Sequence, residues 1–140
     1  MSISDPSGYF AADELARVQD ANNAWDAILA LYNVTITEVS DPTLANVPLE
    51  NNTPTACGGM SNGVLGCYNQ ANNEITMVQG WNWYAGCDPS QTGASQYDFE
   101  TTVLHELGHA MGLGGSTNPG SRMFETLAPG AVLRTGNPQD

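Results

Sequence analysis

The sequence is poor in positive charge. It contains no lysine, and three arginines stand against fifteen acidic residues, which gives a net charge of −12. Three positive charges can neutralise few of the phosphate groups of a nucleic acid. The composition therefore argues against nucleic-acid binding. The sequence also lacks an apolar run of about eighteen residues, the minimum for a membrane-spanning helix. We therefore expect neither nucleic acid nor membrane as a partner.

The length of 140 residues suits one compact domain. Hydrophobic residues make up 41% of the chain and charged residues 13%, which supports a buried core and argues against disorder. We expect residues 1–140 to form a single domain. The last four residues, Asn-Pro-Gln-Asp, resemble the capped start of a helix. This ending predicts that the sequence is truncated before a C-terminal helix.

The N-terminus has neither the basic nor the apolar segment of a signal peptide, which fits a cytosolic protein or a mature fragment with an added Met1. Two of the three cysteines, Cys57 and Cys67, are ten residues apart beside glycines, a spacing that suits a disulfide across a short loop. Cys87 would then be unpaired, and the alternative is three reduced thiols. Cysteine spacing, acidity and the absence of lysine together favour a secreted, extracellular protein.

Apolar spacing predicts two helices, one over residues 10–32 that Asn33 ends, and one over residues 98–112 that Asp98 caps. The apolar stripe of the first helix consists of Val18, Ala21, Trp25, Ile28, Leu29 and Tyr32. Short strands are expected at residues 34–39, 45–49, 63–68 and 74–78, and loops at residues 86–97 and 112–130. This order of elements predicts an α+β layered domain.

The only two histidines, His105 and His109, are four residues apart in the second predicted helix. Side chains at positions i and i+4 share one helix face, so both imidazoles can reach one metal ion. Glu106 follows the first histidine and is placed to polarise a metal-bound water. The pattern predicts His105 and His109 as metal ligands and Glu106 as a general base. The alternative is a pair of ordinary surface histidines beside a helix glutamate.

The run from His105 continues as HELGHAMGLGGS and resembles the extended HExxHxxGxx zinc motif of the metzincin clan, most closely its matrixin-type peptidases. Met123 stands where that clan has its Met-turn, which implies that it forms the floor of the site. The resemblance implies an α+β catalytic domain with a small twisted mixed sheet, an N-terminal helix and an active-site helix. It also implies a zinc metalloendopeptidase that binds an extended peptide along an exposed strand edge.

Gly115 stands where a metzincin presents its third zinc ligand, and glycine has no side chain to donate. Arg122 also departs from the pattern, because a small apolar residue usually precedes the methionine. Water, Glu125 and Cys87 are the alternatives for the missing donor. Since catalytic zinc sites normally have three protein ligands, we expect weak zinc binding and impaired activity.

The sequence contains two weaker patterns besides the histidine motif. Asp88, Ser90, Thr92 and Gly93 imitate the start of a calcium loop, but Phe99 stands at the twelfth position, where a carboxylate is required. A calcium ion is thus possible but unsupported, and a simple turn is the alternative. Trp81 and Trp83 alternate with Asn82, which predicts a strand whose tryptophans pack on the core. The alternative is that Trp81, Trp83 and Tyr84 line a ligand cleft.

Three functions follow from these patterns. The first is hydrolysis of peptide bonds through a zinc-bound water, with Glu106 as general base and Gly115 impairing the rate. The alternative is an inactive pseudo-peptidase that binds peptides or proteins without cutting them. The third is an extracellular structural or calcium-stabilised module in which the histidine pair is incidental. In the first two, the expected partner is a peptide or protein, and the chain is expected to be a monomer.

Overall fold

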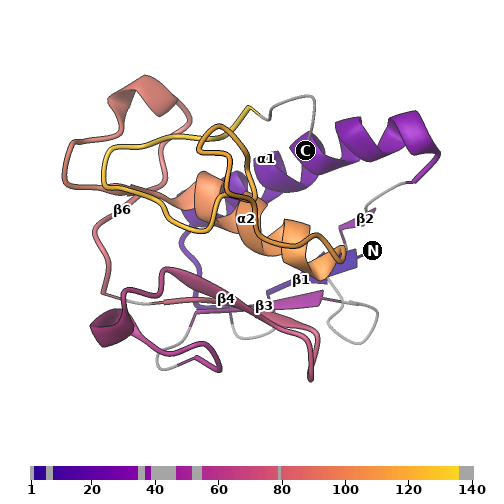
Figure 1. Ribbon diagram of the computed structural model, residues 1–140, viewed down its shortest axis with the longest axis horizontal. Coiled ribbons are helices and arrows are strands. Elements are labelled where there is room, and N and C mark those ends of the chain that lie inside the picture. The colour runs from indigo at the N-terminus through magenta and orange to yellow at the C-terminus, as the bar shows by residue number, and fades with distance from the viewer. Residues whose placement is uncertain are drawn as a thin grey trace.

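The computed structural model describes residues 2–5, 8–34, 37–38, 47–51, 55–78 and 80–135. Within these ranges a mixed sheet carries both α-helices on one side, with the C-terminal loops lying over the second helix (Figure 1). Helix α1 spans Ala12–Leu29 and helix α2 spans Phe99–Ala110. No helix in the described ranges combines the length and the apolar character that crossing a membrane requires. The α+β class expected from the sequence is confirmed.

The main sheet has five strands in the order β2-β1-β3-β5-β4. Their bounds are Ser2–Ser4 for β1, Thr37–Glu38 for β2, Val47–Asn51 for β3, Gly66–Asn69 for β4 and Glu74–Met77 for β5. Four strands run parallel, whereas β4 is antiparallel to β5, with Gly66 opposite Met77 and Asn69 opposite Glu74. The sheet is therefore mixed, and β4 forms its edge beside α2.

The expected strands overlap the observed ones wherever the chain is described. β5 matches residues 74–78 closely, while β3 and β4 begin two or three residues later than expected. The strand at residues 34–39 is described only as β2. The sequence did not predict strand β1 or strand β7 (Tyr97–Asp98), which covers the last residue of the expected loop and the expected helix cap. Strand β7 pairs in parallel with β6 (Trp83–Tyr84), which lies where the tryptophan pattern predicted a strand. The helix-like ending at residues 137–140 lies outside the described residues.

Helix α1 begins with Asp13 and Glu14 in its first turn, where acidic side chains suit the positive end of the helix dipole. A 3₁₀ turn, Ala30–Tyr32, follows, and Asn33 ends it in the left-handed conformation with φ of 59°. Tyr32 is 73% exposed, so its place in the apolar stripe was wrong. The tighter 3₁₀ winding after Leu29 shifts later residues off the face that an α-helix would continue.

The core lies between α1, α2 and β5. Its largest fully buried side chains include Trp25 of α1, Phe99 and Leu104 of α2, and Ile75 of β5. The Trp25 indole donates a buried hydrogen bond of 2.8 Å to the Leu104 carbonyl oxygen. Trp83 packs edge-to-face on Phe99, with ring centroids 5.4 Å apart, as expected of a core residue. This packing fixes α2 against both its neighbours.

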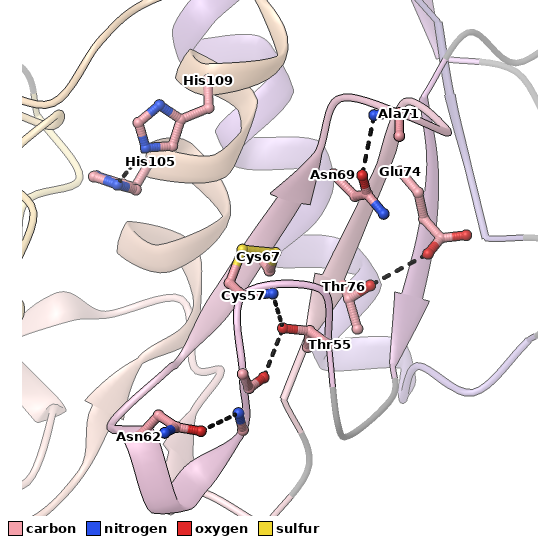
Figure 2. The surroundings of a disulfide bond; sticks show 12 residues. Thr55, Cys57, Asn62, Cys67, Asn69, Ala71, Glu74, Thr76, His105 and His109 are labelled. Carbon is pink, nitrogen blue, oxygen red and sulfur yellow. Dashed lines mark hydrogen bonds between the residues drawn. A yellow bond between two sulfur atoms is a disulfide. The ribbon is translucent and has the colours of Figure 1, made fainter.

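Cys57 and Cys67, the pair that the sequence suggested, form a disulfide with Cα atoms 5.9 Å apart (Figure 2). The bond ties a tight turn, in which Thr55 and Gly58 exchange backbone hydrogen bonds of 3.0 and 3.1 Å, to strand β4. Gly58 has φ of 112°, which a residue with a side chain rarely adopts. Cys87 is exposed and carries a free thiol.

The segment around Asp88 forms a turn. The Asp88 carboxylate accepts hydrogen bonds from the Ser90 amide at 3.0 Å and the Ser90 hydroxyl at 2.7 Å, capping the short 3₁₀ helix Pro89–Gln91. Phe99 is 1% exposed in the core. The local contacts thus fit the turn alternative.

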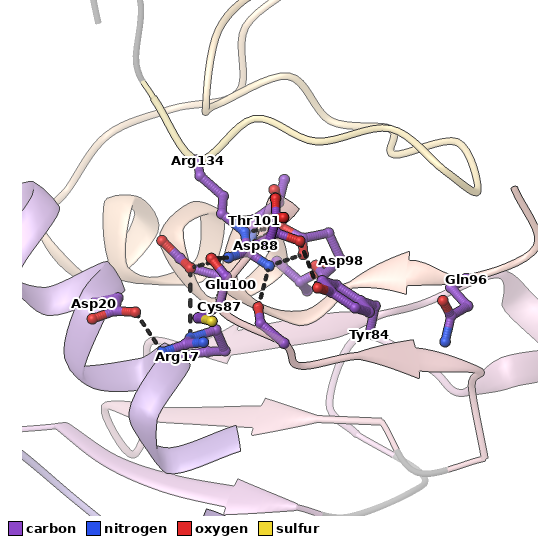
Figure 3. A network of polar contacts seen from close by, with 12 residues as sticks. Arg17, Asp20, Tyr84, Cys87, Asp88, Gln96, Asp98, Glu100, Thr101 and Arg134 are labelled. Atoms are coloured by element: carbon purple, nitrogen blue, oxygen red, sulfur yellow. Dashed lines mark hydrogen bonds and ion pairs between the residues drawn. The ribbon is translucent and has the colours of Figure 1, made fainter. Parts of the chain in front are cut away.

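The chain after the last helix is held by Arg134 (Figure 3). Its guanidinium donates to both carboxylate oxygens of the fully buried Asp98, at 3.0 and 2.6 Å, and forms an ion pair of 2.9 Å with Glu100. It also donates to the carbonyl oxygens of Gly86 and Cys87. Because Asp98 caps α2 through the Thr101 amide, one cluster joins the helix start to the C-terminal segment.

We expect Arg134→Ala to lower the free energy of unfolding by about 3–5 kcal/mol, since it leaves the buried Asp98 charge uncompensated. Arg134→Lys keeps the charge but loses the two-pronged geometry, so its loss should be smaller. Urea denaturation of the three proteins measures both effects. An Arg134→Ala variant as stable as the parent would show that the cluster contributes nothing.

Gly108 of α2 is needed for close packing. A Cβ built there would lie 2.9 Å from Met123 Cε, 3.3 Å from Trp25 Cζ2, and closer still to Met123 Sδ. Alanine normally favours a helix over glycine by about 1 kcal/mol, but overpacking a core costs about 1–3 kcal/mol. We therefore expect Gly108→Ala to destabilise the fold by about 1–2 kcal/mol.

Gly114→Ala is the matched control, because a Cβ at that position meets no atom within 4 Å. We expect its unfolding free energy to stay within about 0.5 kcal/mol of the parent. Thermal denaturation of both variants makes the comparison. If Gly108→Ala were the more stable of the two, helix propensity rather than the Met123 contact would dominate at this position.

Candidate metal centre

Helix α2 exposes only three of its twelve residues, and two of these are the histidines. His105, His109 and Ala110 are half-buried, while every other residue of the helix is buried. The exposed side faces a cavity of about 940 Å³, bounded by strand β4, the turn after α2 and the segment that contains Arg122 to Leu127. The fold therefore leaves one face of α2 open, and that face carries the motif.

Both imidazoles are oriented by backbone carbonyl oxygens. His105 Nδ1 lies 3.0 Å from the Arg122 oxygen, and His109 Nδ1 lies 2.9 Å from the Leu113 oxygen. Because a carbonyl oxygen only accepts hydrogen bonds, each Nδ1 must carry the hydrogen. In the neutral rings, each Nε2 then presents a lone pair to the cavity. Orienting contacts of this kind are typical around histidines that bind metals.

The two Nε2 atoms lie 2.9 Å apart, with their rings nearly perpendicular (Figure 2). Two facing lone pairs at this distance are stabilised by a shared cation, either a proton or a metal ion. Zn–N bonds of about 2.0–2.1 Å at a tetrahedral angle place two ligand nitrogens about 3.3–3.4 Å apart, so a small rotation of either ring would suit one zinc ion. The donor chemistry of His105 and His109 thus fits two ligands of one zinc ion.

A sharp turn after α2 places the carbonyl that orients His109. The Leu113 amide donates to the Gly108 oxygen at 3.0 Å and the Gly112 amide to the His109 oxygen at 2.9 Å, which is the Schellman pattern. Gly112 has φ of 91°, so a side chain there would be strained. The glycine that the motif requires therefore has a direct role in directing an imidazole.

The segment predicted as the Met-turn packs against helix α2. Met123 is 4% exposed and packs on the core beside Gly108, and its amide donates a hydrogen bond of 3.0 Å to the Ser121 hydroxyl oxygen. The preceding Arg122 is buried, with its guanidinium 5.2 Å from the centre of the Trp25 ring. The sequence did not indicate that the Arg122 carbonyl orients His105, because a backbone contact leaves no signature in residue type.

Glu106 is buried between α2 and β4, with 6% of its surface exposed. A Cβ at Gly66 of β4 would lie 3.1 Å from Glu106 Cγ and 3.2 Å from Oε1, so a larger residue there would crowd this side chain. Burial raises the pKa of Glu106 to about 7, although a hydrogen bond with the Tyr68 backbone opposes the shift. A carboxyl group in this range suits proton transfer near neutral pH.

Burial also lowers the pKa of His105, and the nearby His109 adds to this effect. The backbone contact with Arg122 and the negative charge of Glu125 oppose it. The net shift favours the neutral imidazole, which is the form that can bind a metal ion. The negative charge of Glu125 therefore raises the pKa of His105, in opposition to the effect of burial.

The described residues contain no group of three histidine, cysteine or carboxylate side chains arranged to hold a metal ion. Gly115 provides no donor, as the sequence implied. Glu125 and Cys87 are the two side chains that could replace the missing donor, and of these Glu125 lines the cavity beside the histidines. Cys87 does not line it and lies instead on the exposed loop near Arg134. The structure therefore brings only one of the two substitutes near the site.

Comparison with known proteins agrees with this geometry. The family model described as Matrixin matches residues 10–136. The chain is also 26% identical over 127 residues to Metalloendoproteinase 4-MMP of Arabidopsis thaliana, an alignment that covers 86% of this chain and 36% of that protein. The chain thus spans little more than a third of its relative. Because the family match extends over most of the sequence, the chain belongs to the matrixin family.

Proposed function

We propose that this chain is the catalytic domain of a secreted zinc metalloendopeptidase. The observation that carries the proposal is the pair of imidazoles whose Nε2 atoms face each other 2.9 Å apart while their Nδ1 atoms are held by carbonyl oxygens. Membership of the matrixin family supports it. The disulfide supports secretion, because such bonds persist in oxidising compartments. The domain is proposed to act as a monomer.

His105 and His109 would hold the zinc ion, and Met123 would support them from below. When bound, zinc supplies Lewis-acid polarisation of the scissile carbonyl and lowers the pKa of a water molecule. Glu106 accepts the proton from the attacking water and passes it to the nitrogen of the departing amine. Glu106 lines the cavity, and its burial against β4 shields the carboxylate from bulk water.

The substrate is proposed to be an extended peptide or protein segment along β4. In the described part of the chain this strand pairs only with β5, and its residues Gly66 to Tyr68 line the cavity. A peptide can therefore add to this edge through main-chain hydrogen bonds. The neighbouring half-buried Trp81 also lines the cavity, so of the two tryptophans this one fits the cleft alternative and Trp83 the core.

A second function, a pseudo-peptidase that binds peptides without cutting them, is favoured by a different observation. Catalytic zinc sites normally have three protein ligands, whereas Gly115 provides none and the described donors form no three-membered group. The cavity and the β4 edge would then remain as a binding site. Measuring hydrolysis in the presence of zinc separates the two functions.

We expect Glu106→Gln to reduce peptide hydrolysis by about 10²- to 10⁴-fold, since the amide cannot accept the proton. Zinc affinity should stay close to that of the parent, because Glu106 is not a proposed ligand. Cleavage of a denatured protein with added Zn²⁺, followed by mass spectrometry, measures the rate. Glu74→Gln is the control, because Glu74 lies on β5 outside the cavity lining. A parent that cleaves no faster than Glu106→Gln would favour the pseudo-peptidase.

A further inference from the structure

The side chain of Glu125 occupies the space that a side chain at position 115 would need. A Cβ built on Gly115 would lie 2.6 Å from both Cγ and Cδ of Glu125, and closer still to Oε1. Real Cβ atoms essentially never lie within 3.0 Å of another heavy atom, so a side chain at position 115 would require Glu125 to move from the place it occupies. The carboxylate of Glu125 therefore lies at the position from which a residue at 115 would extend.

The backbone keeps Glu125 at this position. The Ser116 amide donates a hydrogen bond of 2.7 Å to the Met123 oxygen, and Ser116 forms an isolated parallel bridge with Phe124. The bridge places Gly115 and Ser116 beside Met123 and Phe124, so the next residue, Glu125, lies close enough for its side chain to reach Gly115. The contact is thus built into the turn that also carries Met123.

Among the described residues that line the cavity, Glu125 is also the one remaining side chain of a type that commonly binds zinc. That lining contains six side chains of the histidine, cysteine and carboxylate types: Cys57, Cys67, His105, Glu106, His109 and Glu125. The two cysteines are joined in the disulfide, and Glu106 is the proposed general base. With the histidines taken as ligands, Glu125 is the donor that no other role accounts for.

We propose that the Glu125 carboxylate is the third protein ligand of the zinc site and replaces the side chain that Gly115 lacks. The inference rests on the zinc function proposed above. Two histidines and one glutamate form a ligand set that other catalytic zinc sites use. Glu125 is exposed and has three rotatable side-chain bonds, so its carboxylate can turn from Gly115 toward the imidazoles when the ion enters.

The test is the affinity of the purified chain for Zn²⁺, measured by competition with a chelating dye. Loss of an outer contact to a metal ligand commonly costs about 10- to 100-fold in affinity, so loss of a ligand should cost at least about 100-fold. We expect this loss in Glu125→Ala and in Glu125→Gln, which keeps the size of the side chain. The visible spectrum of the Co²⁺-loaded protein should change in both, because it reports the ligand set directly.

Two further variants complete the design. Glu74→Gln removes one negative charge away from the cavity and should change Zn²⁺ affinity less than about threefold, which separates ligation from net charge. The double variant Gly115→His with Glu125→Ala removes the obstructing side chain and adds an imidazole. This double variant should bind Zn²⁺ at least about tenfold more tightly than Glu125→Ala does. Circular dichroism checks that each variant is folded.

The outcomes separate the two proposals. If Glu125→Ala binds Zn²⁺ within about threefold of the parent while His105→Ala does not bind, Glu125 is not a ligand and the zinc function stands. If the parent binds Zn²⁺ no better than His105→Ala, the site does not bind zinc and both proposals are overturned. A loss in both Glu125 variants, without a loss in Glu74→Gln, supports Glu125 as the ligand.

Discussion

Helix α2 is held on one side by α1 and on another by the sheet, and a buried hydrogen bond of 2.8 Å from the Trp25 indole to the Leu104 carbonyl joins the helices. This burial leaves only His105, His109 and Ala110 partly exposed. Everything proposed for the site follows from that constraint, because it decides which helix face can meet a metal ion and a substrate. The clusters around Arg134 and Met123 then attach the C-terminal loops to the same helix.

The parts of the structure that sequence could predict are those with local causes. The two histidines share a face because they are four residues apart on a helix, and Asp98 caps that helix through the Thr101 amide three residues later. Strand β1 could not be predicted, since three residues form a strand there only by pairing with β2 and β3, which come later in the chain. Likewise, only the tertiary fold separates the roles of Trp81 and Trp83.

The candidate metal site also combines features that the sequence could predict with features that depend on the tertiary fold. Sequence could identify Glu106 and the histidines, but it could not show that Gly66 leaves room for Glu106 or that the carbonyls of Arg122 and Leu113 direct the imidazoles. It offered Glu125 and Cys87 as equal substitutes for a missing donor. The turn that joins Ser116 to Phe124 distinguishes them, because it brings Glu125 to the space beside Gly115 while Cys87 stays on another loop.

The two imidazoles of α2 and the carboxylate of Glu125 are together proposed to hold zinc in a matrixin domain that lacks the usual third donor. X-ray absorption at the zinc edge of the Zn²⁺-loaded protein tests this proposal most directly. We expect two imidazole nitrogens at about 2.0–2.1 Å and oxygen at about 2.0–2.2 Å from the zinc ion. A spectrum showing only oxygen neighbours, without imidazole scattering, would contradict it.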